Sequence, residues 1–121
     1  MHVVRNIFFS LALLVSTQAL AHTKLTGSTP NDGDLLSAAP AFLELRFTGK
    51  VRLLKLRLVN AENQVIPLEF KPQKAAKDTF EIALPPLTPS RFTVHWRGMG
   101  SDAHKISGRL TFTLDAIQSV Q

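Results

Sequence analysis

Three residues of this chain have the types and positions that metal chemistry requires: His22, Asp102 and His104. His22 directly follows Gln18 to Ala21, a stretch that ends in the A-x-A pattern at which a signal peptidase cuts. After cleavage behind Ala21, the α-amino nitrogen of His22 and its ring Nδ1 can bind one metal ion together in a six-membered chelate. Two nitrogens from one residue suit a square-planar cupric ion. The alternative is that the peptidase merely tolerates a small polar residue here.

Asp102 and His104 supply the second part of the pattern, in the stretch Ser101-Asp102-Ala103-His104. In an extended chain, residues two apart point the same way, so this carboxylate and this imidazole can face one point. One amine, two imidazoles and one carboxylate form an N₃O ligand set for Cu(II) or Ni(II). An Asp-x-His pair alone would be read as part of a solvated turn. Its combination with an N-terminal histidine favours a metal site.

The first 21 residues differ from the rest of the chain. Arg5 is their only charged side chain, and the apolar run from Ile7 to Val15 is broken only by Ser10. A spanning helix needs about 20 apolar residues, so this run predicts a secretory signal peptide instead of a membrane anchor. We therefore expect a signal peptide at 1–21 and one exported domain at 22–121, with no membrane insertion of the mature chain.

Composition excludes several classes of function. The chain has no cysteine, which excludes disulfides, thiolate metal sites and a cysteine nucleophile. Its 14 Lys and Arg against 9 Asp and Glu give a mild positive charge, and the bases are scattered along the sequence without interleaved aromatic residues. Nucleic acid is therefore not an expected partner, and the basic residues are interpreted as a solvated surface.

Period-two alternation of apolar and polar residues predicts half-buried strands. Between these strands lie turn signals such as Pro30-Asn31-Asp32-Gly33 and the proline-rich stretch 85–90. About seven short strands at this spacing predict an all-β, immunoglobulin-like Greek-key β-sandwich. The clearest alternations lie at 43–47, 54–58, 80–84, 92–97 and 110–114, with weaker candidates at 24–28 and 65–70. The expected core is Leu43, Leu45, Phe47, Leu54, Leu56, Leu58, Phe80, Ile82, Phe92, Val94, Trp96, Leu110 and Phe112.

The mature sequence resembles the copper resistance protein CopC family. The resemblance rests on the opening from His22 to Gly33, on Pro40 with the strand at 43–47, and on the stretch from Phe92 through Asp102 and His104 to Gly108. It implies a small periplasmic β-sandwich, a monomer, that binds Cu(II) through His22, Asp102 and His104. An inner-membrane copper transporter of the CopD type is the partner that the resemblance suggests.

The chain departs from the family pattern at two places. Some members carry a second, Cu(I) site in a loop rich in methionine, but the corresponding region, about Arg57 to Pro72, holds neither methionine nor histidine. The only methionines are Met1 and Met99, so we expect a Cu(II) site alone. The glycine-rich stretch from Arg97 to Ser101 also replaces a bulkier family sequence, which predicts a looser approach to Asp102.

Three functions compete on this sequence. The first is a periplasmic Cu(II)-binding protein for carriage, buffering or resistance, without turnover. The second is a small copper oxygenase, disfavoured because the chain has no tyrosine for an axial position and little surface for a polymer. The third is a metal-independent, immunoglobulin-like interaction module that partners a membrane copper transporter. His95 is expected to face solvent, and Met99 lies near the site in sequence without a predicted role.

Overall fold

The computed structural model describes residues 23–116, and these residues form strands, turns and loops without a helix. No stretch in this range is a helix long and apolar enough to cross a membrane. The all-β prediction is therefore confirmed. The strands are β1 (Leu25–Thr29), β2 (Leu35–Leu36), β3 (Phe42–Val59), β4 (Val65–Ile66), β5 (Lys77–Ala83), β6 (Ser90–Gly100) and β7 (Lys105–Leu114).

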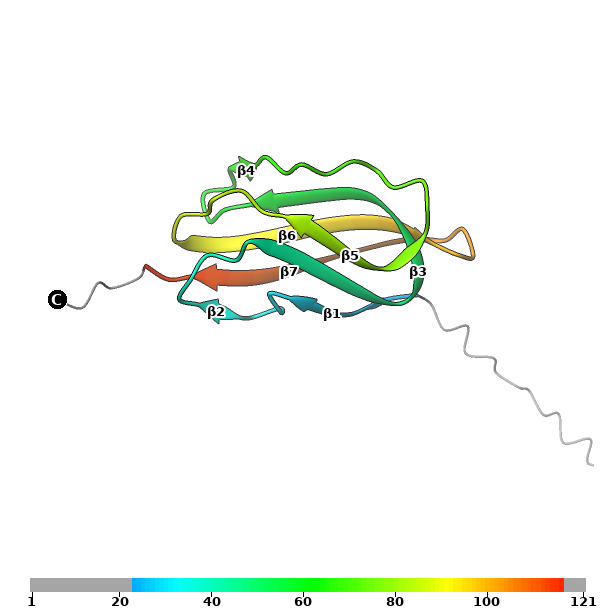
Figure 1. The fold of residues 1–121 in the computed structure, drawn as a ribbon, viewed down its shortest axis with the longest axis horizontal. Helices are drawn as coiled ribbons and strands as arrows, with labels where there is room; N and C mark the ends of the chain where they lie inside the picture. Colours follow the sequence, from blue (N-terminus) through cyan, green and yellow to red (C-terminus); the bar gives the residue numbers. More distant parts are fainter. Residues whose placement is uncertain (1–22, 117–121) are drawn as a thin grey trace, which may run out of the picture.

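The long strand β3 belongs to both layers of the sandwich. Its first half pairs with β1 on one side and with β5 on the other, whereas its second half pairs with β4 and β6. β6 continues the second layer to β7, and the two-residue β2 closes the edge beyond β7. Figure 1 shows β3 bending at one end of the molecule as it passes from the β1–β5 layer to the β6–β7 layer.

The continuity of β3 differs from the two separate strands that the sequence predicts, at 43–47 and 54–58. Its pairing with β6 shifts register between Leu53 and Lys55, and this irregularity changes which side chains face inward. Val51 and Leu53 are fully buried, whereas Leu54, expected in the core, is only partly covered. The core prediction is wrong at Leu54 for this reason. The remaining predicted core residues are buried or pack against the buried cluster.

Trp96 is a buried core residue of β6, next to β7. Its ring meets that of Phe47 edge to face, with centroids 5.1 Å apart. Gly108 lies opposite Trp96 in the β6–β7 register, and a Cβ atom at Gly108 would lie 2.6 Å from Cζ2 of the indole. The glycine is thus required because the indole occupies the space that a side chain would need.

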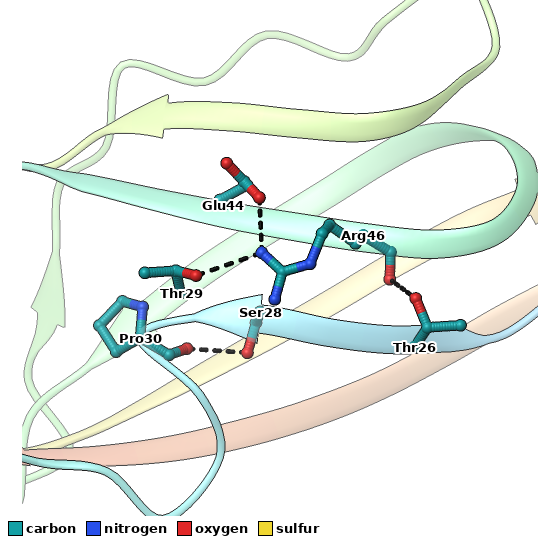
Figure 2. Close-up of polar contacts among 6 residues, drawn as sticks. All are labelled: Thr26, Ser28, Thr29, Pro30, Glu44 and Arg46. Carbon is teal, nitrogen blue, oxygen red and sulfur yellow. Dashed lines mark hydrogen bonds and ion pairs between the residues drawn. The ribbon is translucent and has the colours of Figure 1, made fainter.

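Polar contacts hold β1 against the first half of β3 (Figure 2). The guanidinium group of Arg46 donates hydrogen bonds to Glu44 and to the hydroxyl of Thr29. The hydroxyl of Thr26 donates to the backbone carbonyl of Arg46 at 3.1 Å. These contacts fix β1 along its length, and the chain that enters β1 is thereby held at one end of the sandwich.

Candidate metal centre

The β6–β7 hairpin carries two of the predicted ligands among the four residues, 101–104, that join the strands. The backbone N–H of Gly100 donates to the carbonyl of His104, and the N–H of Ala103 donates to the carbonyl of Gly100, both at 3.0 Å. Ala103 has a φ angle of 63°, in the left-handed region. A turn followed by one left-handed residue is a common way to close a hairpin of this length.

This loop brings Asp102 and His104 into direct contact. Oδ1 of Asp102 accepts the backbone N–H of His104 at 3.1 Å, and Oδ2 lies 2.8 Å from Nδ1 of the same residue. The backbone hydrogen bond, followed by the contact with the ring, holds the pKa of Asp102 below its ordinary value. The side chains are 47% and 67% exposed, so the carboxylate and the imidazole meet at the surface, where an ion can reach them.

The sequence predicts that Asp102 and His104 lie together, but for a different reason from the one the structure shows. The sequence predicts that Asp102 and His104 face one point because the chain is extended. The structure instead places them in a turn, and the left-handed backbone of Ala103 reverses the chain between them. Extended geometry is therefore the wrong explanation, and the turn is the correct one.

Thr23 lies beside this pair. A Cβ atom at Gly100 would lie 3.0 Å from Oδ1 of Asp102 and 3.5 Å from Oγ1 of Thr23, so both side chains lie against the same point of β6. A Cβ at Gly49, in the bend of β3, would lie 3.4 Å from the same hydroxyl. The absence of side chains at the two glycines lets the start of the described chain approach the hairpin closely.

Backbone hydrogen bonds fix the next residue, Lys24. Its N–H donates to Oγ1 of Thr48 at 3.0 Å, and its carbonyl accepts the N–H of Thr48 at 2.9 Å. In Figure 1 the start of β1, the bend of β3 and the β6–β7 turn lie at the same end of the molecule. Three segments that are distant in sequence therefore meet where Asp102 and His104 lie.

His22, the third predicted ligand, lies outside the described residues, as does the predicted signal peptide at 1–21. Within 23–116, no group of three or more histidine, cysteine, aspartate or glutamate side chains could hold a metal ion. The described part of the site is thus the Asp102–His104 pair together with the chain that leads from Thr23.

The two residues without a predicted role lie elsewhere on β6. His95 is half-buried on the outer face, paired with Arg57 on β3 and with Arg109 on β7. Met99 pairs with Lys105 at the base of the hairpin. Neither lies in the loop that joins Asp102 to His104.

The importance of Thr23, Gly100 and Ala103 was not predicted. The glycine-rich stretch was expected to loosen the approach to Asp102, but Gly98 and Gly100 are paired and buried within β6. A Cβ at Gly98 would lie 2.6 Å from Val51, so that glycine too permits close packing. Glycines inside a strand often mark such approaches, and this signal was available in the sequence.

Comparison with known proteins agrees with this architecture. A family model described as the CopC domain matches residues 25–115. Copper resistance protein C of Pseudomonas syringae pv. tomato is 32% identical over 113 residues, which cover 86% of this chain and 89% of that protein.

Two solved structures share the fold. The crystal structure of CopC from Methylosinus trichosporium OB3b aligns with a TM-score of 0.70 at 23% identity, over 83% of this chain and all of that one. PcoC, a methionine-rich copper resistance protein from Escherichia coli, aligns with a TM-score of 0.63 at 26% identity, over 78% of this chain and all of that one. With the family model spanning nearly all the described residues, the chain belongs to the CopC family.

Proposed function

We propose that this protein binds Cu(II) in the periplasm and acts in copper carriage, buffering or resistance. The ligands would be the α-amino group and ring of His22, the carboxylate of Asp102 and the imidazole of His104. Relatives named copper resistance protein C support the choice of metal. Cleavage behind Ala21, which the sequence predicts, would create the required amine.

The observation that carries the proposal is the position of Thr23 beside Asp102. Thr23 and Asp102 lie against the same glycine, Gly100, and His22 is the residue directly before Thr23. Consecutive Cα atoms are about 3.8 Å apart, so the bond to Thr23 would keep the Cα atom of His22 within a few ångströms of the hairpin. The amine and the second imidazole would therefore be available to the same ion as the pair.

The Asp102–His104 pair offers one oxygen donor and one nitrogen donor side by side. Ligand atoms about 2.0 Å from a divalent transition metal and at right angles to each other are about 2.8 Å apart. Oδ2 of Asp102 and Nδ1 of His104 are separated by 2.8 Å. That distance is also the length of an ordinary hydrogen bond, so an ion would replace this hydrogen bond, and both donor atoms would have to turn toward it.

The ligand set favours Cu(II) over Cu(I). Thioether sulfur is the ligand that stabilises Cu(I), and PcoC of Escherichia coli is described as methionine rich. This sequence has two methionines, Met1 and Met99, and a single thioether near the hairpin does not make such a site. We therefore propose one Cu(II) site without a Cu(I) site.

The same ligands argue for binding without catalysis. A carboxylate ligand stabilises the cupric state, whereas redox turnover needs access to both oxidation states. The protein would act as a monomer that exchanges copper with an inner-membrane transporter of the CopD type.

The proposal is tested by titrating Cu(II) into protein whose first residue is His22, verified by mass, and into the same protein preceded by one additional residue. The extension converts the amine into an amide and should reduce Cu(II) affinity sharply while leaving the fold unchanged by circular dichroism. Equal affinity of the two proteins would remove the amine from the site. Absence of saturable binding in both would favour the metal-independent interaction module.

A further inference from the structure

The outer face of the second layer collects basic residues that are scattered in the sequence. On the second half of β3 and on β6 and β7, exposed cations alternate with buried apolar residues. Paired residues of neighbouring antiparallel strands lie on the same face of a sheet, so these cations share one surface. We call it the basic face, and its principal members are Arg52, Lys55, Arg57, Arg97, Lys105 and Arg109.

Like charges are direct neighbours on the basic face. Lys55 pairs with Arg97, and His95 lies between Arg57 and Arg109 in one cross-strand row. Like charges placed opposite each other destabilise a sheet. The second half of β3, β6 and β7 contain no aspartate or glutamate to offset this repulsion.

The described residues offer these cations no ion pair. In the range 23–116, the only salt bridges join Arg46 to Glu44 and His104 to Asp102, and neither involves a cation of this face. One carboxylate, that of Asp32, borders the depression beside Arg91 and Arg109, where its Oδ1 accepts the backbone N–H of Thr111 at 2.8 Å. The charge of the basic face is therefore left for a partner.

The surface is also hollowed where the cations gather. A depression of about 360 Å³ is lined by Lys55, Arg57, Arg97 and Arg109, together with His95 and Ser107. Guanidinium groups bind planar carboxylates through two parallel hydrogen bonds, and most cations of this face are arginines. Carboxylate side chains of a protein can enter this depression and reach the cations that line it. A flat layer of lipid headgroups would touch only the outermost cations.

We propose that the basic face binds an acidic segment of a partner protein. The segment would present several carboxylates to the paired cations of neighbouring strands, such as Lys55 with Arg97. Charge complementarity carries this assignment, and it is independent of the metal site. The Met99–Lys105 row adjoins the hairpin that carries Asp102 and His104, so a partner docked here would lie beside that hairpin.

The test uses poly-L-glutamate as the acidic probe and compares two sets of substitutions with equal change in net charge. The first set is Arg57→Glu, Arg97→Glu and Arg109→Glu on the basic face. The control set is Lys71→Glu, Lys74→Glu and Lys77→Glu, which are exposed and lie outside β3, β6 and β7. We expect the first set to weaken binding by about tenfold or more and the control set to retain most of it.

Three results would overturn the proposal. Equal losses in both sets would mean that binding follows net charge, and tighter binding to phosphatidylglycerol vesicles than to poly-L-glutamate would assign the face to a membrane. If the charge reversals prevent folding, Arg57→Gln, Arg97→Gln and Arg109→Gln remove the charges without adding new ones. Unchanged binding in that folded variant would also refute the proposal.

Discussion

Ala103 determines whether Asp102 and His104 can act together, because its left-handed backbone reverses the chain between them. Left-handed geometry costs an ordinary residue about 1–2 kcal/mol, and β-branched residues tolerate it least. The contact of 2.8 Å between the two side chains thus depends on a residue that bears no ligand atom.

Substitution of Ala103 should separate backbone geometry from ligand chemistry. Ala103→Val is expected to lower the free energy of unfolding by about 1 kcal/mol or less and to weaken Cu(II) binding, since β-branched valine tolerates the left-handed region less well than alanine, which already bears most of the cost. Ala103→Gly is the matched control and should keep the Cu(II) affinity and be at least as stable as the parent, because glycine adopts this conformation without the cost that alanine bears. Urea unfolding and Cu(II) titration of both variants measure the effect. Full Cu(II) affinity in a folded Ala103→Val variant would show that the turn is unimportant.

At the scale of elements, periodicity predicted most of the strands and the all-β class. Alternating residues predicted the inner faces of β6 and β7, because those strands pair without interruption. The sequence could not show that β3 is continuous or that its register shifts after Leu53, since both depend on which strands lie beside it. The two-residue β2 is too short to produce a periodic signal.

Gly108 offers a test of packing between β6 and β7. Gly108→Ala would place a Cβ atom 2.6 Å from the indole of Trp96, which is 5% exposed and held against Phe47. Overpacking of this kind typically costs 1–3 kcal/mol, so urea unfolding should show a loss of about that size. Ser107→Ala, at the exposed neighbouring position, is the control and should stay within about 0.5 kcal/mol of the parent. A Gly108→Ala variant as stable as the control would contradict the packing described.

At the scale of the whole molecule, the site and the basic face depend on contacts between distant segments. The sequence predicted the proximity of Asp102 and His104 because they are two residues apart. The sequence order does not reveal that Thr23 reaches Gly100, or that Arg57, His95 and Arg109 form one row. Such neighbours follow from strand register, which the chain acquires only when it folds.

The response of copper binding to pH should reflect the lowered pKa of Asp102. A carboxylate whose pKa is lowered stays charged as the pH falls, and loses its charge only below the ordinary range. Protons compete with Cu(II) for the nitrogen ligands, so binding should weaken as the pH falls. Cu(II) affinity should therefore fall from pH 8 to pH 5 while Asp102 remains ionised.

Comparison with Asp102→Asn checks this order of protonation. The substitution should weaken Cu(II) binding by about 10- to 100-fold, and by a similar factor at every pH from 8 to 5. Asp78→Asn, at an exposed position on β5, is the control and should leave the affinity unchanged. A difference between Asp102→Asn and the parent that disappears near pH 6 would mean that Asp102 takes up its proton there.

If His22, Asp102 and His104 hold one Cu(II) ion, pulsed electron paramagnetic resonance should detect the nitrogen atoms of both imidazoles. The sample is protein that begins at His22 and carries one equivalent of Cu(II), compared with its His104→Ala variant. We expect a type 2 spectrum with couplings from two imidazoles, one of which is lost in the variant. An identical spectrum in both proteins would show that His104 is not a ligand and would contradict the proposed three-residue site.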